Sequence, residues 1–403
     1  MTRPAAALVT PIEPARTGNG LAMRVGLIRD ALAQAHRVDV VVIDPSPGGA
    51  PSPDPGRVAQ WLADPLWRDR LHATVPWPVD CGGSGPDAVA GLAAGLAGPH
   101  SLVVVCRARL APFALAFPQS GPGRPRLVLD LDDDEVVTHR RLAALARAGG
   151  DADLALRHDD EAEAYARFVA GWAPLYDETW VASAADRSAA PGRVRVVPNA
   201  VEVGAEGDAD PSRSADSTPF GRRDRLLFVG NLTYAPNVDA ARRLALEVVP
   251  LVADRLRRPV RLDLVGRADA AVQALDAVEG VTVHGQVEQV APFYRDAPLV
   301  VVPLRAAGGT RIKVLEALAH GCEVVATALA VEGLDVESGR ELTVVADEVG
   351  PLVAACAEAL DRPVDRARLD AGLAYVRAHH DRDRVVGDLA SVIGPRDGRG
   401  PET

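Results

Sequence analysis

Cysteine, lysine and long apolar runs are scarce in this chain, and each shortage excludes a class of protein. No apolar run approaches the ~20 residues that span a bilayer, and no signal-peptide core forms near the first residue. The cysteines lie too far apart for a disulfide framework or a zinc knuckle; they are Cys81, Cys106, Cys322 and Cys356. We therefore expect a cytoplasmic protein without a transmembrane segment, which leaves peripheral membrane contact open.

The chain also lacks the basic excess of proteins that bind nucleic acid. Its 44 Lys and Arg residues face 55 Asp and Glu residues, so the net charge is −11. Because nucleic-acid affinity comes largely from neutralised phosphates, we expect no nucleic-acid partner. A dinucleotide fingerprint starting at Gly18 would need glycine where Met23 stands. A P-loop would need glycine directly before Lys313, and none stands there. These absences argue against NAD-dependent enzymes and ATPases.

Lys313 is the only lysine of the chain, whose composition is dominated by Ala, Arg, Gly, Pro and Val. GC-rich codons favour such a composition, so a lysine that persists is a sign of chemical need. Lysine is a compact charge on a flexible stem, whereas arginine is a planar fork, and a tight anion site distinguishes them. Chance survival is the alternative.

Strand and helix patterns alternate in both halves, and the length of 403 residues suits two or three domains. Val- and Leu-rich runs predict strands at 6–10, 38–43, 102–106, 127–131, 179–182, 194–197, 226–229, 260–265, 281–284, 299–302 and 323–326. Helical patterns cover 21–34, 87–96, 159–172, 237–256 and 312–320, with a helical tail from 351. Nearly continuous apolar strands belong to parallel sheets covered on both faces.

We therefore predict an α/β fold of two doubly wound, Rossmann-like domains facing a central cleft. The N-terminal domain is expected at 1–202, and a linker rich in Gly, Asp, Ser and Pro at 203–223. The C-terminal domain is expected at 224–378, followed by a helix and tail at 379–403. In such folds, ligands lie at the carboxyl ends of the strands.

The segment 308–321 carries the strongest chemical signal. Gly308 and Gly309 permit close approach of the backbone, and a helix is expected to begin near Thr310. The free N–H groups of its first turn favour an anion, and Arg311 and Lys313 add positive charge.

Lys313, Glu316 and His320 are spaced to share one face of that helix. The expected buried stripe on the opposite side consists of Ile312, Leu315 and Ala319. Six residues separate Thr310 from Glu316, or ~9 Å of helix, which matches the span from a diphosphate to its ribose hydroxyls. The pattern favours a nucleoside diphosphate with its ribose on Glu316, over a solvated Lys–Glu pair of little energetic weight.

Two further loops follow the first strand of each half and present backbone N–H groups to a ligand. The first contains Gly18, Asn19 and Gly20, candidates for donor or phosphate binding, with Arg24 one turn into the next helix as a candidate for contact with the acceptor. The second contains Gly230 and Asn231. Each is also compatible with an ordinary turn.

The segment 130–135 contains the one candidate metal cluster in the sequence, which consists of Asp130, Asp132, Asp133, Asp134 and Glu135. They fit a D-x-D metal–nucleotide site or a haloacid-dehalogenase phosphatase, although Asp134 stands where the phosphatase needs Thr or Val. Helix capping and solvation are the alternatives, and we expect no metal. Arg107, after the strand at 102–106, is a candidate for contact with an acceptor or a phosphate.

In the order in which they occur, these motifs resemble a known family. The matching pieces are Thr17-Gly18-Asn19-Gly20, Val196–Val201, Leu227–Leu232, Pro236-Asn237, Leu264-Val265-Gly266, Val283-His284-Gly285, Gly308–Gly321 and Val324–Thr327. The sequence resembles a GT-B fold glycosyltransferase of retaining family 4 (glycosyl transferases group 1). Within it, the sequence is similar to a polysaccharide-associated branch with Gly-Thr-Arg-Ile-Lys.

The resemblance implies metal-independent and cofactor-independent transfer of a sugar from a nucleotide-diphosphate sugar, with retention, to a sugar, lipid-linked or small-molecule acceptor. It implies that the N-terminal domain binds the acceptor and the C-terminal domain the donor. The implied donor residues are Gly230, Asn231, Arg311, Lys313 and Glu316.

Two features depart from the family pattern. Gly308 stands where the family has the first of two glutamates, and the loop at Gly230 lacks the usual basic pair, whose task would pass to Arg311 and Lys313. A catalytically silent nucleotide-sugar-binding protein or partner subunit, and a nucleotide-sugar epimerase or hydrolase, are therefore the alternative functions.

Overall fold

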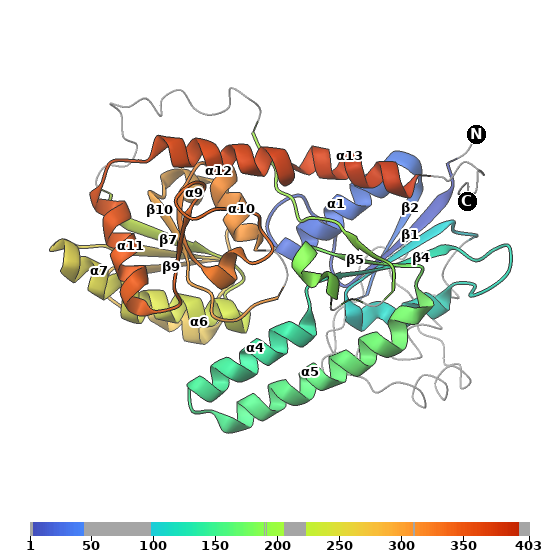
Figure 1. Cartoon of the computed structure of the whole chain (residues 1–403), viewed down its shortest axis with the longest axis horizontal. Helices are drawn as coiled ribbons and strands as arrows, with labels where there is room; N and C mark the ends of the chain where they lie inside the picture. The colour runs from blue at the N-terminus through green and yellow to red at the C-terminus, as the bar shows by residue number, and fades with distance from the viewer. Residues whose placement is uncertain are drawn as a thin grey trace. The chain divides into compact units, whose positions relative to one another are not determined.

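The computed structural model describes residues 3–43, 98–188, 190, 192–204, 223–308 and 311–394 (Figure 1). The chain divides into two compact units. Unit 1 comprises Met1–Arg16, Leu21–Pro198 and Asp383–Thr403, and unit 2 comprises Thr17–Gly20 and Asn199–Arg382. The expected helix at 87–96 and most of the expected linker, 205–222, lie outside the described residues.

Unit 1 contains a parallel sheet of six strands in the order β2-β1-β3-β4-β5-β6. The strands are β1 (Ala5–Thr10), β2 (Arg37–Val42), β3 (Leu102–Cys106), β4 (Arg126–Asp132), β5 (Glu178–Val181) and β6 (Val194–Val196). The helices are α1 (Gly20–Ala35), η2 (Ala108–Ala116), α4 (Glu135–Ala148), α5 (Ala152–Trp172), η3 (Ala173–Leu175), η4 (Ala184–Ser188) and α13 (Arg382–Ile393). All six strands expected in this half are confirmed to within one residue at each end.

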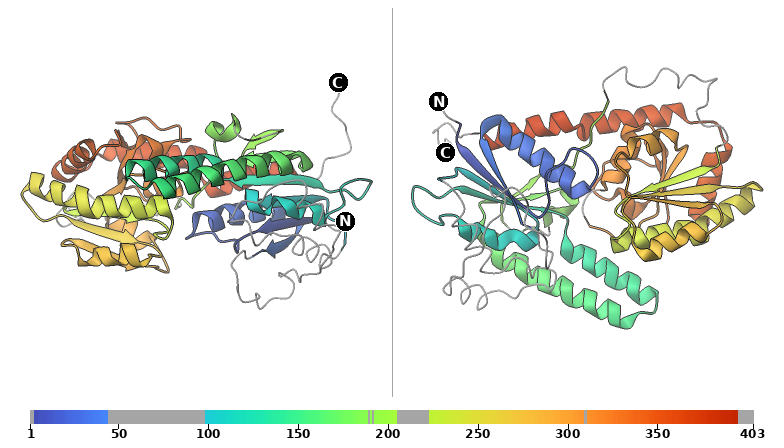
Figure 2. Two further views of the ribbon diagram at one scale, coloured as in Figure 1. Left: turned by 90° about the horizontal axis from the view of Figure 1, so that it is seen from below. Right: turned by 180° about the vertical axis from the view of Figure 1, so that it is seen from behind.

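The central strands β1 and β3 of unit 1 are buried because they are almost entirely apolar. On one face of the sheet, Val103, Val105 and Leu129 pack against η2 and against Phe168 and Trp172 of α5. Each such side chain contributes ~1.5–3 kcal/mol when it is fully buried. Figures 1 and 2 show α4 and α5 running side by side as a helical pair. Both begin with an aspartate cap, since Asp134 and Asp151 accept hydrogen bonds from the N–H groups of their first turns.

Unit 2 contains a second parallel sheet, in the order β12-β11-β10-β7-β8-β9. The strands are β7 (Arg225–Val229), β8 (Arg261–Val265), β9 (Val281–Gly285), β10 (Leu299–Val302), β11 (Glu323–Thr327) and β12 (Thr343–Val345). The helices are α6 (Ala235–Arg243), η5 (Leu244–Val248), α7 (Val249–Leu256), α8 (Ala270–Gln273), η6 (Ala274–Ala277), α9 (Ala291–Asp296), α10 (Ile312–Ala319), η7 (Ala328–Val331), α11 (Val349–Asp361) and α12 (Arg366–His379). The predicted doubly wound α/β class is confirmed for both units.

The strand order of unit 2, counted from β9, is 3-2-1-4-5-6, and the order reverses between β7 and β10. In unit 1 the corresponding reversal lies between β1 and β3. Loops that leave neighbouring strands in opposite directions open a crevice at such a point, and ligands bind there. The segments 230–234 and 303–308 follow β7 and β10, so the topology places them at the switch point of unit 2.

The helix expected over 237–256 is interrupted. Its middle, Leu244–Val248, is a π-helical turn between α6 and α7. Pro250, in the first turn of α7, has no N–H to donate to the carbonyl four residues earlier, which accounts for the altered bonding pattern. Among the described residues, no helix combines the length and apolar composition needed to cross a bilayer.

A glycine directly follows each of the strands β7 and β8, and the backbones of these two glycines are in contact. Gly266 has φ +133°, and a Cβ built on it would stand 1.8 Å from the carbonyl oxygen of Gly230. Only glycine adopts this conformation freely and leaves room for its neighbour. The contact fixes the course of the Gly230 loop at the switch point.

We predict that Gly266→Ala destabilises the protein by ~3 kcal/mol or more, because both the clash and the positive φ oppose the new methyl group. Thermal unfolding should shift downward by roughly 10 °C in a unit of this size. Gly350→Ala is the matched control, since a Cβ at this position in α11 meets nothing within 4 Å. Equal melting temperatures for the two variants would contradict the geometry.

Candidate functional site

Helix α10 carries the candidate residues Lys313 and Glu316 in unit 2. Its buried side chains are Val314, Leu315, Ala317 and Leu318, whereas Ile312 and Ala319 are only partly buried. The expected buried stripe was therefore right for Leu315 and wrong for Ile312 and Ala319. The helix packs into the unit over a broad apolar arc rather than one narrow row of positions.

The residues leading into α10 are described in part. Gly309 and Thr310, both predicted to bind phosphate, lie outside the described residues. Arg311, the residue before the helix, is 5% exposed. Its Nη1 donates to the carbonyl oxygen of Gly308, and its Nη2 lies 3.8 Å from a carboxylate oxygen of Glu332. The guanidinium is thus held within the loop at the start of α10.

Lys313 lies against the end of strand β7. Its Nζ donates to Oδ1 of Asn237 and lies 4.8 Å from the centre of the Phe228 ring. A Cβ built on Gly230 would stand only 3.1 Å from this Nζ, so the ammonium group lies close to the Gly230 backbone. Burial, reinforced by the Arg311 charge, lowers the pKa of Lys313 to about 7.

Two asparagines shape the loop after β7. Asn231 Oδ1 accepts hydrogen bonds from the N–H and hydroxyl of Thr233, at 3.2 and 2.8 Å, which closes an Asx turn. Asn237 is 6% exposed, and its amide donates to the Asn231 carbonyl oxygen at 2.8 Å while its Oδ1 accepts from Lys313. Sequence analysis noted Asn237 only as part of a motif; the structure places it in the site.

Glu316 lies one turn further along α10 and, like Lys313, is partly buried. The hydroxyl of Tyr294, on α9, donates to its Oε2 at 3.1 Å. Burial raises the pKa of Glu316 to about 7, against the smaller opposing effects of Tyr294 and Lys313. The Tyr294 ring stacks on His320, with ring centres 5.0 Å apart. Sequence analysis placed His320 on this face and missed Tyr294, which contacts the site from another helix.

An ion pair joins the two segments that flank Lys313. Arg305, just after β10, donates through Nε and Nη2 to both carboxylate oxygens of Asp239 on α6, at 2.9 and 2.5 Å. This hydrogen bonding raises the pKa of Arg305. Bidentate pairs fix geometry as well as charge. The pair therefore ties the loop before α10 to the helix that carries Asn237.

In unit 1, Arg24 is buried in an ion pair rather than presented to a ligand. Its Nε and Nη2 donate to the Asp130 carboxylate, at 2.9 and 2.5 Å, and its Nη1 donates to the Val197 carbonyl oxygen at 2.9 Å. Both side chains are fully buried. The predicted contact between Arg24 and an acceptor stays a prediction, but the structure gives its guanidinium an internal role.

Arg107 lies close to three acidic residues at the end of β4 and just after it. Its guanidinium lies 3.4 Å from Asp132, 3.9 Å from Asp133 and 2.9 Å from Glu135. Arg107 and Asp132 have positive φ values of 79° and 58°, an unfavourable conformation for residues with side chains. Asp134 caps α4. Among the described residues no group of three His, Cys, Asp or Glu side chains has the geometry to hold a metal.

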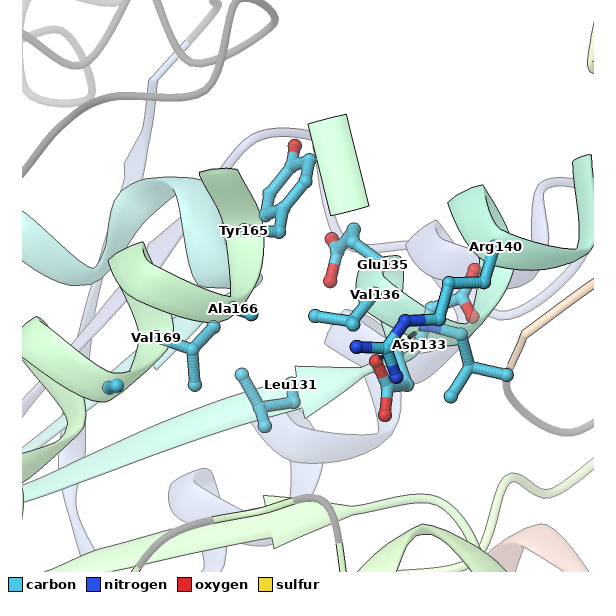
Figure 3. Close-up of a pocket in the computed structure, with 11 residues that line it drawn as sticks. Leu131, Asp133, Glu135, Val136, Arg140, Tyr165, Ala166 and Val169 are labelled. Carbon is cyan, nitrogen blue, oxygen red and sulfur yellow. Dashed lines mark hydrogen bonds between the residues drawn. The ribbon is translucent and has the colours of Figure 1, made fainter. Parts of the chain in front are cut away.

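A cavity of about 280 Å³ adjoins this acidic group in unit 1. Figure 3 shows Leu131, Val136 and Val169 around it, with Glu135 and Arg140 near one side. Its walls are therefore mostly apolar, with charged groups on one side. It lies at the carboxyl end of β4, the edge at which such sheets bind ligands.

The Gly18–Gly20 loop is described and belongs to unit 2, although α1 continues in unit 1. Gly18 has φ +97°, and α1 begins at Gly20. The roles predicted for Gly18, Asn19 and Gly20 stay predictions.

With this geometry established, the chain can be compared with known proteins. Residues 223–362 match the family model "Glycosyl transferases group 1". Over this segment the chain is similar to the glycosyl transferases group 1 family. The segment contains β7, α6, β10 and α10, and hence every residue described around Lys313 and Glu316. A search of curated proteins found no match to the chain.

Solved structures of the GT-B fold resemble the whole chain. Sucrose-phosphate synthase from Thermosynechococcus elongatus is 17% identical with TM-score 0.68, covering 97% of this chain and 98% of that one. Trehalose 6-phosphate synthase from Burkholderia multivorans is 18% identical with TM-score 0.61, covering 97% of each chain. Anabaena HepE in complex with UDP and glucose is 14% identical with TM-score 0.59, covering 96% and 98%. The predicted GT-B fold is thus confirmed.

We predict that Asp130→Asn destabilises the protein by about 3 kcal/mol, because the fully buried Arg24 charge then keeps only the Asp132 carboxylate, 3.5 Å from its Nε. Thermal unfolding measures the loss, which should be the same with and without EDTA. Glu163→Gln, which breaks the exposed pair with Arg167, is the control and should change nothing measurable. A stable Asp130→Asn protein would show that the pair does not hold unit 1 together.

We also predict that Lys313→Met stabilises the unliganded protein, most strongly near neutral pH. A lysine with a pKa of about 7 when folded and near 10.4 when unfolded destabilises the fold fully below the lower value. This cost fades as pH rises toward the higher value. The melting-temperature gain of the variant should therefore be larger near pH 7 than near pH 9.5. A constant gain would show that Lys313 has an ordinary pKa.

Proposed function

We propose that this protein is a glycosyltransferase that moves a sugar from a nucleotide-diphosphate sugar to an acceptor hydroxyl. The observation that carries the proposal is Lys313, a partly buried ammonium that lies against the Gly230 backbone at the switch point of the segment matched by the group 1 family model. Burying an ammonium costs stability, so a site that keeps one there is suited to an anionic ligand. The UDP and glucose in the similar Anabaena structure belong to the same class of donor.

The donor residues follow from their chemistry. Lys313 and Arg311 carry the positive charge nearest the start of α10 and would hold the diphosphate. Glu316 lies three residues further, or ~4.5 Å along the helix, and its carboxylate would accept hydrogen bonds from the ribose hydroxyls. Gly230 lets the backbone approach the donor, Asn231 keeps its loop closed, and Asn237 orients the lysine. Gly309 and Thr310 would complete the phosphate loop.

The proposed chemistry needs charge stabilisation more than a proton-transfer catalyst. The bond between the sugar and the diphosphate breaks while the acceptor hydroxyl attacks the same face and passes its proton to the leaving diphosphate oxygen, so the configuration is retained through an oxocarbenium-like state. Lys313 and Arg311 stabilise the charge that builds on the leaving diphosphate, without a metal. Products of this class belong to polysaccharide, glycoconjugate or natural-product biosynthesis, and Arg107 is the proposed acceptor contact in unit 1.

A second candidate function rests on Gly308, which stands where the resemblance places a glutamate. Without that carboxylate, the protein would bind a nucleotide sugar without turning it over, alone or as a partner of another transferase. Release of nucleoside diphosphate from a bound nucleotide sugar, with acceptor or water, separates the two functions. Turnover supports the enzyme, and tight binding with no turnover supports the silent protein.

We predict that one nucleoside diphosphate from a panel of bases raises the melting temperature of the protein, with or without EDTA. A ligand at ~100 times its dissociation constant adds ~2.7 kcal/mol to the stability of the unit that binds it. Lys313→Ala should lose this shift and about 100-fold or more in turnover, because it removes a donor aimed at the leaving group.

Arg255→Ala is the matched control, since it removes an exposed positive charge from α7 in the same unit. It should retain both the shift and the turnover. A Lys313→Ala protein with near wild-type rates would refute the assignment of the site. Absence of a shift with every base would refute nucleotide-sugar binding itself, and a shift abolished by EDTA would refute metal independence.

A further inference from the structure

Tyr294 contacts the candidate site from α9, whereas the charged residues Lys313 and Glu316 lie on α10. It is 0% exposed and donates its hydroxyl hydrogen to Glu316 Oε2 at 3.1 Å. Stacking on His320 fixes the ring on one side, and Cys322 Sγ contacts the Tyr294 carbonyl oxygen at 3.1 Å. Burial and the neighbouring Glu316 carboxylate raise the pKa of Tyr294 well above 10, so the hydroxyl remains a donor at every working pH.

This hydrogen bond divides the two oxygens of the Glu316 carboxylate between different tasks. Oε2 accepts from the tyrosine, whereas Oε1 accepts from none of the residues that the structure describes. A carboxylate with one oxygen anchored cannot rotate freely, so the other oxygen keeps a fixed direction. A fixed acceptor suits a ligand whose donors are themselves rigidly spaced, and the two neighbouring hydroxyls of a ribose ring are such donors.

We propose that Tyr294 is a positioning residue that fixes the Glu316 carboxylate for a ribose, so that the site selects ribonucleoside over 2′-deoxyribonucleoside diphosphates. This inference rests on the proposed function, in which Glu316 meets the ribose. A deoxyribose leaves the carboxylate with one donor fewer, and buried polar groups without partners reject such analogues strongly. A carboxylate free to turn would meet the remaining hydroxyl almost as well, and the selectivity would fall.

The test compares dissociation constants of two probes by calorimetry: the nucleoside diphosphate that shifts the melting temperature most, and its 2′-deoxy form. Wild type should prefer the ribonucleotide by about tenfold or more, equivalent to ~1.4 kcal/mol. Tyr294→Phe should bring this ratio close to one, mainly by weakening the ribonucleotide. The matched control is Tyr176→Phe, which removes a tyrosine hydroxyl that donates to the Ala111 carbonyl oxygen at 2.6 Å in unit 1. Its ratio should equal that of wild type.

A double-mutant cycle tests whether Tyr294 acts through Glu316. Glu316→Gln should lower the ratio by itself, and adding Tyr294→Phe should then change it no further. Further loss of selectivity in the double variant would show that Tyr294 acts independently of Glu316, and would overturn the inference.

Other outcomes separate this inference from the proposed function. If wild type binds neither probe, the proposed function fails. If wild type binds both and Tyr294→Phe keeps the full preference, the Tyr294 inference alone is overturned. Should Tyr294→Phe fail to fold, Glu316→Asp carries the test, since it keeps the charge but withdraws the carboxylate from the hydroxyl. Undiminished selectivity in Glu316→Asp overturns the inference.

Discussion

The partial burial of Lys313 and Glu316 on one short helix is the constraint around which the rest of the site in unit 2 is arranged. Their pKa values both move to about 7, in opposite directions, because burial disfavours the charged form of each. Neither forms an ion pair with a described residue; one amide and one hydroxyl are their hydrogen-bond partners. The fold therefore bears a desolvation cost that a hydrophobic pair at the same positions would not incur. Such costs are typical of functional sites.

The surrounding residues partly compensate the cost of this burial and fix the position of the lysine side chain. Gly230 and Gly266 have no side chains, so two strand ends meet and the lysine lies against bare backbone. Phe228 offers a ring face to the ammonium group, an attraction that strengthens when water is excluded. Asn237 contacts the lysine and the loop after β7 at once, so the position of the charge depends on the conformation of the loop. The same elements would bring backbone N–H groups and the ammonium to one ligand.

How much the sequence predicts depends on whether a feature is local. The strand at 299–302 and the placement of Lys313 and Glu316 on one helix could be predicted, because apolar runs and helical spacing depend on residues that are close in sequence. Tyr294 could not, because its contact with Glu316 depends on how α9 packs beside α10 and leaves no periodic trace. The π turn at 244–248 was missed because helical periodicity outweighed Pro250. The pairing of Arg24 with Asp130 spans 106 residues, so the acidic cluster looked more open to a metal than it is.

The charged groups of the two candidate regions, Arg24 and Arg107 in unit 1 and Lys313 in unit 2, are compensated differently. In unit 1, Arg24 pairs with Asp130, and three carboxylates lie within 4 Å of the Arg107 guanidinium. Both of these positive charges are therefore compensated by nearby negative charge. An anion gains little from such a site, and the adjoining cavity is mostly apolar. In unit 2, Lys313 forms no ion pair with a described residue; its hydrogen-bond partner is the neutral amide of Asn237, and its Nζ lies over the Phe228 ring. An anion bound beside it would favour its protonated form. Two sheets of similar topology thus carry different charge environments at these points, and the proposed binding of a charged donor in unit 2 agrees with that difference.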